Sequence, residues 1–308
     1  MNIQWYPGHM TKAKRAMEEA VKLIDLVIEL VDARAPLSSR NPEIDQLGKG
    51  KARLILLNKA DLADERANDL WISYFSSMGF QAVKLNCRSG AGLKQIQGAV
   101  MEACKEKLER DKRKGIQNRP IRAMVAGIPN VGKSTFINAF AKKSCTKTGN
   151  KPGVTKGNQW IRLSKWLELL DTPGILWPKF EDQEVGRKLA FIGSINDDIL
   201  NKEELALELI NLLLNWYPQS LTGRFGIDKM EALSVLEEIG RVRGCLQKGG
   251  GLDMGKAANV FFDDFRSGKL GRITLELPEN TGEMSENAGE VSENSLKPSR
   301  DIPGSISK

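Results

Sequence analysis

Residues 127–134 read Gly-Ile-Pro-Asn-Val-Gly-Lys-Ser, which is the G-x-x-x-x-G-K-S pattern of a phosphate-binding loop. The apolar run 121–126 precedes this loop, and a helical pattern over 133–142 follows it. Glycines let backbone N–H groups converge on phosphate oxygens, while the lysine reaches the β- and γ-phosphates and the serine hydroxyl binds Mg²⁺. The stretch therefore predicts a strand–loop–helix unit that holds a nucleoside triphosphate.

A second polar motif, Asn58-Lys59-Ala60-Asp61, directly follows the apolar run 53–57. We expect the Asp61 carboxylate to accept hydrogen bonds from the ring N–H and the exocyclic amine of guanine. Adenine presents an acceptor at the same ring position, and buried mismatches of this kind discriminate between bases by ~10⁴ or more. The stem of Lys59 can cover the plane of the base, and Asn58 can tie loops together. This motif predicts selectivity for guanine.

Three further stretches complete the expected nucleotide site. Asn86-Cys87-Arg88 follows another apolar run and resembles the loop that backs the base in other GTPases, where the usual sequence is Ser-Ala-Lys. In Asp171-Thr-Pro-Gly174, we expect Asp171 to contact Mg²⁺ through water and the N–H of Gly174 to contact the γ-phosphate. Thr155 lies between the two phosphate motifs, where a switch threonine would close on Mg²⁺.

The motifs stand in an unusual order. In an ordinary Ras-like GTPase the phosphate loop comes first and the base reader near the end, whereas here the base reader comes first. The apolar runs are 26–31, 53–57, 82–85, 121–126 and 167–170, and helical patterns over 63–78, 93–110 and 133–142 lie between them. This alternation predicts a mostly parallel sheet with helices on both faces. Since such sheets bind ligands at the carboxyl ends of their strands, the motifs are expected at one edge. The sequence predicts an α/β fold, a circularly permuted Ras-like P-loop GTPase domain followed by a small all-α domain.

The pattern along the chain changes after Pro178. Apolar residues then recur at spacings of three and four, which is typical of helices. Near the C-terminus the sequences ENTGEMS and ENAGEVS repeat, each with a glycine and one apolar residue, so disorder is expected there. We expect nucleotide state to set the orientation of the helical domain through the short connection 175–182. The expected divisions are a permuted GTPase domain with its N-terminal segment over 1–178, a helical RNA-binding domain over 183–277 and a disordered acidic tail over 278–308.

Charge is distributed unevenly over the 308 residues. The net charge is +7, but residues 278–308 hold six acidic and three basic residues, so the rest of the chain carries +10. A basic body favours a polyanionic partner, most simply RNA, although a soluble protein can also be basic without such a partner.

Other compositional features bear on location. The four cysteines lie far apart without a C-x-x-C pair, which disfavours a zinc site and fits a reducing cytoplasm. No apolar run approaches the ~20 residues of a membrane helix. The first residues lack the basic-then-apolar pattern of a secretory signal. We expect a cytoplasmic protein with no membrane and no DNA among its partners.

The group that orients the attacking water is not fixed by the motifs. Ras-type enzymes place a glutamine after the glycine of the third motif, but here Ile175 follows and cannot form a hydrogen bond. His9, the one histidine, could orient water, or it could dock the N-terminal segment or bind RNA. Asn130 could help to hold a potassium ion that replaces an arginine finger, or it could stabilise the loop.

Over residues 1–277 the chain resembles the YlqF/YawG family of circularly permuted GTPases. The resemblance rests on Trp5-Tyr-Pro-Gly-His9-Met, Asp32-Ala-Arg-Ala-Pro36, Asn58-Lys-Ala-Asp61, Gly127-Ile-Pro-Asn-Val-Gly-Lys-Ser-Thr135, Pro152-Gly-Val-Thr155 and Asp171-Thr-Pro-Gly-Ile-Leu-Trp-Pro178. It implies late assembly of the large ribosomal subunit, binding to its RNA and a catalytic role for His9. Nothing carries over to the repetitive tail.

These patterns define a set of expectations. The expected activity is Mg²⁺-dependent hydrolysis of GTP to GDP and phosphate, stimulated by ribosomal particles, by a monomer that binds the large-subunit precursor and its rRNA. Two alternatives stay open: an RNA chaperone that uses GTP as a locking ligand, and a GTPase in another RNA-processing step. The expected catalytic residues are His9, Lys133 and Thr155, and the expected metal ligands are Ser134, Thr155 and Asp171. The expected nucleotide-binding residues are Asn58, Lys59, Asp61, Asn86, Cys87, Asn130, Val131, Gly132, Lys133, Ser134, Thr135 and Gly174.

Overall fold

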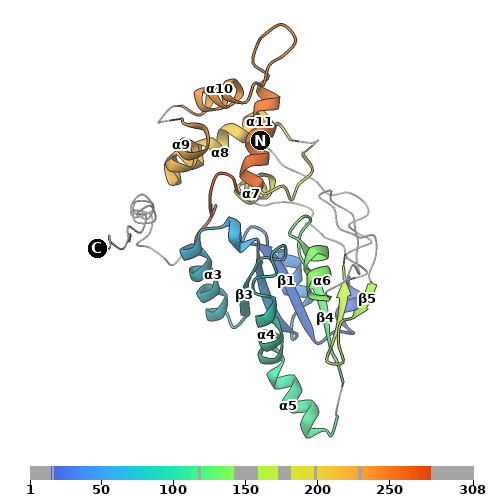
Figure 1. Cartoon of the computed structure of the whole chain (residues 1–308). Coiled ribbons are helices and arrows are strands. Elements are labelled where there is room, and N and C mark those ends of the chain that lie inside the picture. The colour runs from blue at the N-terminus through green and yellow to red at the C-terminus, as the bar shows by residue number, and fades with distance from the viewer. Residues whose placement is uncertain are drawn as a thin grey trace, which may run out of the picture.

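A six-stranded sheet with the order β3-β2-β1-β4-β6-β5 forms the centre of the structure (Figure 1). The structure, a computed structural model, describes residues 15, 17–116, 119–141, 159–172, 182–197, 200–227 and 231–278. Neighbouring strands are parallel except for β5 and β6, which are antiparallel. The strands are β1 (Leu26–Asp32), β2 (Ala52–Asn58), β3 (Gln81–Leu85), β4 (Ile121–Ala126), β5 (Gln159–Arg162) and β6 (Leu167–Asp171).

The sheet is assembled from two successive parts of the chain. Strands β1, β2 and β3 form one half, strands β4, β6 and β5 form the other, and the halves join where β1 pairs with β4. A chain that began at β4 and continued from β6 to β1 would meet the motifs in the usual order. The α/β, circularly permuted fold predicted from the motif order is therefore confirmed.

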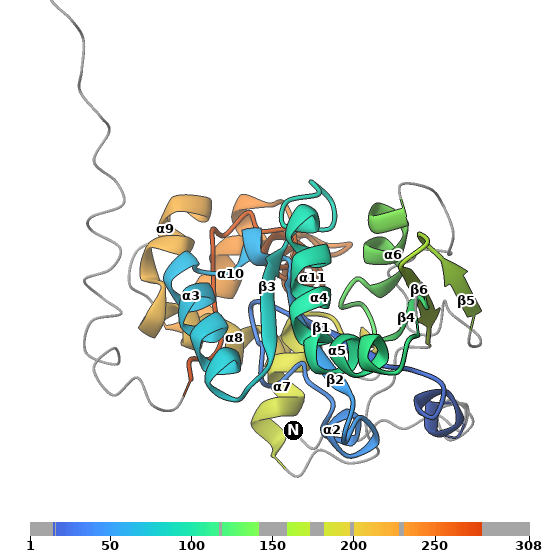
Figure 2. The ribbon, with the colours of Figure 1, turned by 90° about the horizontal axis from the view of Figure 1, so that it is seen from below.

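Helices cover both faces of the sheet. On one face, Trp71 and Phe75 of α3 pack against Ile55 and Leu57 of β2. The alternate residues of β2, Leu54 and Leu56, belong to the main core with α4, so α3 and α4 lie on opposite faces, on either side of β3 in Figure 2. Residues 17–21 are helical, and the further helices of this part are α2 (Pro42–Leu47), α3 (Glu65–Ser77), α4 (Ile96–Ala103), α5 (Lys105–Arg113) and α6 (Lys133–Ala141), with 3₁₀ turns η1 (Ala60–Leu62) and η2 (Leu93–Gln95).

The strands follow the sequence prediction closely, but one helix does not. A single helix was expected over 93–110, whereas the chain forms η2, α4 and α5, with a break at Cys104. Cys104 is buried with φ −97° and ψ 9°, outside helical geometry, and the highly charged α5 that follows contributes no buried residue. Because Leu108 is the one apolar residue of α5, the helix packs little surface on the core and projects away from the sheet (Figure 1).

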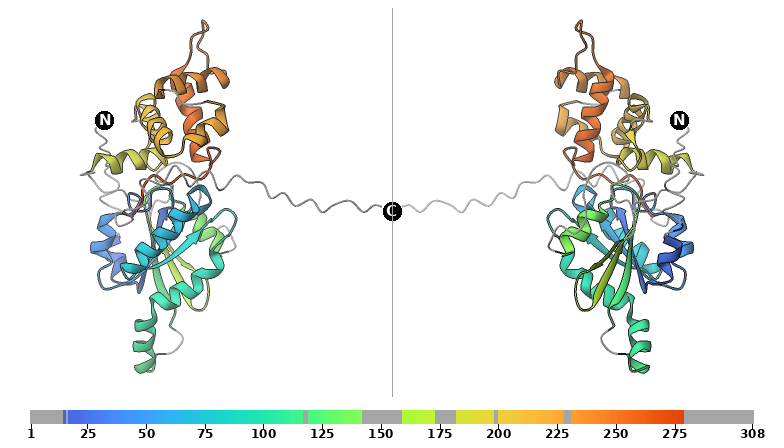
Figure 3. Two further views of the ribbon diagram at one scale, coloured as in Figure 1. Left: turned by 90° about the vertical axis from the view of Figure 1, so that its left-hand side faces the viewer. Right: turned by 90° about the vertical axis from the view of Figure 1, so that its right-hand side faces the viewer.

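A second group of helices gathers at the carboxyl end of the sheet (Figures 1 and 3). Their shared core includes Leu209 and Leu213 of α8, Leu236 of α10 and Phe261 of α11. Helix α9, and α2 in the first part, were not predicted. This group consists of α7 (Gln183–Phe191), α8 (Lys202–Trp216), α9 (Pro218–Phe225), α10 (Ala232–Val242) and α11 (Met254–Arg266). None of the described helices is both long and apolar enough to cross a membrane.

After α11 the chain runs back against the sheet domain through residues 272–276, here called the return segment. The Glu276 carboxylate accepts hydrogen bonds from the N–H of Leu37 at 2.6 Å and of Ser38 at 2.8 Å, and from the Ser38 hydroxyl. Lys188 of α7 lies 3.3 Å from the same carboxylate. The indole of Trp71 donates to the Glu276 carbonyl at 3.1 Å. One nearly buried carboxylate thus joins the loop after β1 to the helical part.

Replacing this carboxylate tests its contribution to stability. Glu276→Gln keeps the shape but loses the charge that the two N–H groups and Lys188 face. We expect the free energy of unfolding to fall by about 1–3 kcal/mol, because hydrogen bonds to a buried charge are the stronger kind. Urea unfolding followed by circular dichroism measures the change. Glu102→Gln, at an exposed glutamate of α4, is the matched control and should shift stability by less than about 0.5 kcal/mol.

Candidate nucleotide-binding site

The Asn58 carboxamide links two loops at the carboxyl edge of the sheet. Its Nδ2 donates to the Val131 carbonyl at 2.8 Å, and its Oδ1 accepts from the Cys87 N–H at 3.2 Å. Gly132 makes this possible, since it has φ +102° and an added Cβ would lie 2.4 Å from Nδ2 of Asn58. Asn58 thus holds the predicted phosphate loop and the predicted base-backing loop together.

The phosphate loop lies between β4 and α6 and is tightly packed. Gly127 has φ +147°, and a Cβ there would lie 2.6 Å from the Leu30 carbonyl oxygen of the neighbouring strand. Val131 is buried, whereas Gly132, Ser134 and Thr135 are partly exposed. The buried Lys133 ammonium donates to the carbonyls of Gly127 and Ile128, both at 2.9 Å. Lys133 is therefore held inside the curve of the loop, where a phosphate-binding lysine is expected.

Asp171 and Lys133 form a buried pair of titratable groups beside this loop. Burial raises the pKa of the Asp171 carboxyl to about 6, although the Lys133 ammonium acts in the opposite direction. Burial lowers the pKa of the Lys133 ammonium to about 8, although the Asp171 carboxylate opposes this shift. Oδ1 of Asp171 is buried without a hydrogen-bond partner among the described residues. A buried carboxylate oxygen left without a donor, beside a phosphate loop, is the kind of oxygen ligand that Mg²⁺ prefers.

The residues expected to read the base lie just after β2 and β3. Asp61 is exposed in the turn η1. Asn86 is partly buried, and its Oδ1 accepts from the N–H of Arg88 at 2.9 Å and of Ser89 at 3.1 Å, which shapes the loop that presents Cys87. Burial raises the pKa of the Cys87 thiol to about 12, so this thiol stays neutral.

Lys59 adopts the left-handed backbone region with φ +59° and directs its ammonium to Asp32, 2.7 Å away. Arg34 also contacts Asp32 through two guanidinium nitrogens, each at 2.9 Å. Burial would raise the pKa of Asp32, but Arg34 and Lys59 hold it well below the usual range. Asp32 therefore carries a permanent charge that fixes the head of Lys59. The sequence motifs assigned no role to Asp32, and its position at the carboxyl end of β1 is the signal that could have found it.

Asn130 connects the phosphate loop to the helical part. It has φ +59°, and its Nδ2 donates to the Gly193 carbonyl at 2.8 Å. Gly193 lies just after α7, and the Arg266 side chain of α11 donates to the last carbonyls of that helix, those of Ala190 and Phe191, at 2.8 and 3.0 Å. No local sequence pattern points to Gly193 or Arg266.

Some expected site residues lie outside the described residues. These are His9, Thr155 and Gly174, together with Ile175. The acidic tail from 279 onward and residues 175–181 of the expected connection between domains are outside as well. The other expected residues lie at the carboxyl ends of β2, β3, β4 and β6.

Comparisons with known proteins agree with this geometry. A family profile described as "50S ribosome-binding GTPase" matches residues 122–224. Ribosome biogenesis GTPase A of Bacillus cereus is 50% identical over 284 residues, which cover 92% of this chain and 96% of that protein. The chain belongs to the ribosome biogenesis GTPase A family. The resemblance found in the sequence is therefore confirmed.

More distant members of the ribosome biogenesis GTPase A family extend the agreement to solved structures. The Thermotoga maritima protein of the same name is 32% identical and covers 90% of this chain and 95% of its own length. The crystal structure of GNP-bound YlqF from T. maritima superposes with a TM-score of 0.63 at 29% identity, over 87% of this chain and 99% of that one. The similarity therefore extends through the sheet domain and the helical part.

Replacing Asp171 by asparagine should increase the stability of the fold and abolish nucleotide binding. The folded-state pKa of about 6 lies above the ordinary 3.8, so wild-type stability falls as pH rises from about 4 to about 6. Asp171→Asn removes this dependence. At neutral pH it should raise the free energy of unfolding by about 2–3 kcal/mol, the equivalent of roughly two pKa units, and it should abolish Mg²⁺-dependent nucleotide binding.

Urea unfolding of the wild type and Asp171→Asn over pH 4.5–7.5 measures the difference. Asp263→Asn, at an exposed carboxylate of α11, is the control and should run parallel to the wild type. A wild-type pH profile that Asp171→Asn leaves unchanged would contradict the raised pKa.

Proposed function

We propose that the chain hydrolyses GTP to GDP and phosphate and assists late assembly of the large ribosomal subunit. The convergence of Asn58, Lys133 and Asp171 at one sheet edge, from strands in permuted order, supports this assignment most directly. The names of its relatives, which are ribosome biogenesis GTPases, supply the process.

Each residue has a proposed role. Asp61 accepts from guanine, Lys59 covers the base, and the loop around Cys87 backs it. The N–H groups of the phosphate loop from Asn130 to Thr135 hold the phosphates, and Lys133 stabilises the charge that develops on the β- and γ-phosphates.

Ser134 and Asp171, with Thr155, would hold Mg²⁺. When bound, the ion neutralises charge on the phosphate oxygens. Gly174 binds the γ-phosphate through its N–H. His9 orients the attacking water, since Ile175 cannot. Nδ2 of Asn130 donates a hydrogen bond to the Gly193 carbonyl, so Oδ1 is the atom of this side chain that would bind a potassium ion.

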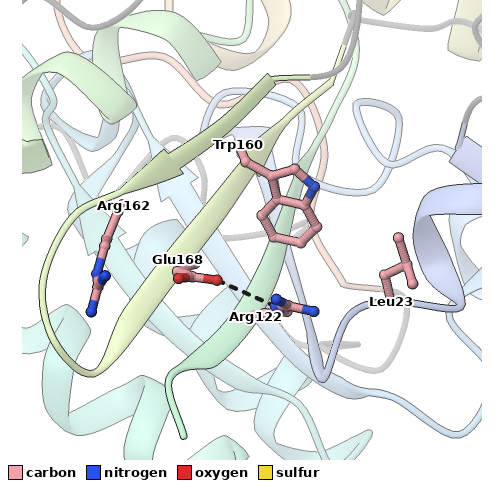
Figure 4. A pocket seen from close by; sticks show the side chains of 5 residues that line it. All are labelled: Leu23, Arg122, Trp160, Arg162 and Glu168. Carbon is pink, nitrogen blue, oxygen red and sulfur yellow. Dashed lines mark hydrogen bonds and ion pairs between the residues drawn. The ribbon is translucent and has the colours of Figure 1, made fainter.

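We propose rRNA as the partner, and one face of the sheet offers a place for it. Arg122, Glu168 and Arg162 form a row across β4, β6 and β5. Beside this row the Arg122 guanidinium lies 5.4 Å from the centre of the Trp160 ring, and Trp160 is 41% exposed (Figure 4). With Leu23 these side chains line a hollow of about 320 Å³. An exposed indole flanked by guanidinium groups suits a stacked base with its phosphates.

Rapid turnover separates a GTPase from a protein that uses GTP as a locking ligand. We expect GTP hydrolysis that requires Mg²⁺ and rises when large-subunit precursors are added, and a loss of at least about 100-fold in Lys133→Ala because a transition-state charge goes unpaired. Phosphate release measures this rate. Equal turnover with and without particles would favour the locking-ligand alternative, and stimulation by unrelated RNA alone would favour another RNA-processing step.

A substitution at Trp160 tests the proposed RNA surface. Trp160→Ala should weaken binding of large-subunit rRNA about tenfold, the effect of one lost base stack, and leave GTP affinity unchanged. Filter binding at fixed salt measures the affinity. Trp216→Ala is the matched control because Trp216, in α8, is also 41% exposed. An equal loss of rRNA affinity in Trp160→Ala and Trp216→Ala would contradict the proposal that this face binds RNA.

A further inference from the structure

The exposed Asp61 carboxylate depends on the backbone beneath it for its position. Asp61 is the middle residue of the three-residue turn η1, which the Leu62 N–H closes onto the Lys59 carbonyl at 2.9 Å. Asn68 of α3 donates to the Ala60 carbonyl at 3.0 Å. A 3₁₀ turn of three residues is a weak unit by itself, so contacts from outside decide how firmly it is held.

The return segment supplies such contacts on the far side of the turn. The Ile273 N–H donates to the Leu62 carbonyl at 2.9 Å. The Asp64 N–H donates to Oγ1 of Thr274 at 3.1 Å. These bonds hold the residue immediately after Asp61 and the residue that caps α3. Thr274 is 1% exposed, so water does not substitute for it.

The end of α11 presses on the same turn. Gly268 lies against Leu62, where an added Cβ would come within 2.6 Å of a Leu62 methyl carbon. The chain that follows α11 therefore meets η1 twice, once by apolar contact and once by hydrogen bonds.

A tyrosine of the helical part holds the return segment in turn. The Tyr217 hydroxyl donates to the Thr274 carbonyl and accepts from the Thr274 N–H, both at 3.2 Å. Tyr217 stands between α8 and α9, so it belongs to the helical group. A continuous path of short contacts runs from α8 through Tyr217 and Thr274 to the turn that carries Asp61.

We propose that Thr274 and Tyr217 are positioning residues of the guanine site, so that docking of the helical part sets the affinity for the base. This inference rests on the proposed role of Asp61. Coupling between two sites is reciprocal, so a partner that pulls the helical part from the sheet domain weakens guanine binding, and bound guanine nucleotide tightens the docking. The return segment thus makes the C-terminal end of the described chain a part of base recognition.

The test compares GDP with inosine diphosphate, which lacks the exocyclic amine that Asp61 reads. Thr274→Val keeps the shape of the side chain and removes the acceptor for the Asp64 N–H. We expect it to lower the preference for GDP over inosine diphosphate by roughly three- to tenfold, the effect of one lost buried hydrogen bond. Tyr217→Phe should act in the same direction, and Thr274→Ser should restore the wild-type preference.

Competition against a fluorescent guanine nucleotide on one full-length preparation measures both affinities, so a partly unfolded fraction affects them equally. Thr222→Val is the matched control, since the Thr222 hydroxyl donates at 2.9 Å to the Ile227 carbonyl within the helical part. If Thr274→Val changes the preference no more than Thr222→Val does, the return segment only stabilises the fold and the inference is overturned. If the wild type itself shows no preference, the assignment of Asp61 to guanine fails first, which is a distinct result.

Discussion

The hydrogen bonds of the Asn58 carboxamide are the constraint on which the nucleotide site depends. One end binds the phosphate loop at Val131, and the other binds the loop of Cys87. Permutation moves these loops into different halves of the chain, and the carboxamide connects them across the β1–β4 boundary. Gly132 is required because any side chain there would occupy the place of Nδ2. One buried side chain thus joins the loop of Cys87 to the phosphate loop.

The charged groups beside the phosphate loop, Asp171 and Lys133, lower the stability of the fold. Burial disfavours the ionised forms of both Asp171 and Lys133, and their mutual attraction offsets only part of that effect. The unpartnered Oδ1 of Asp171 belongs to the same arrangement. Groups strained in this way are typical of sites that bind a charged ligand, because a cation or a phosphate supplies the missing interaction.

Much of the fold was readable from local pattern. The strand runs before Asn58, Gly127 and Asp171 were predicted to within a residue or two, because buried parallel strands are continuous apolar runs bounded by motifs. The break at Cys104 was missed, since it depends on where the charged α5 leaves the sheet. Gly193, Thr274 and Glu276 were missed for a different reason. Each acts through contacts with residues far away in sequence, and neither hydrophobic periodicity nor a motif predicts such contacts. The roles of His9 and Thr155 stay predictions.

The position of the return segment also bears on how the chain is made. Ile273, whose N–H donates to the Leu62 carbonyl, is translated 211 residues after Leu62. At synthesis rates of roughly 5–20 residues per second this interval is about 10–40 s. During that time the turn after β2 lacks its contacts with Gly268, Ile273 and Thr274 and keeps the one from Asn68. If Thr274 positions the guanine site, a nascent chain acquires full guanine affinity only after the return segment has been made.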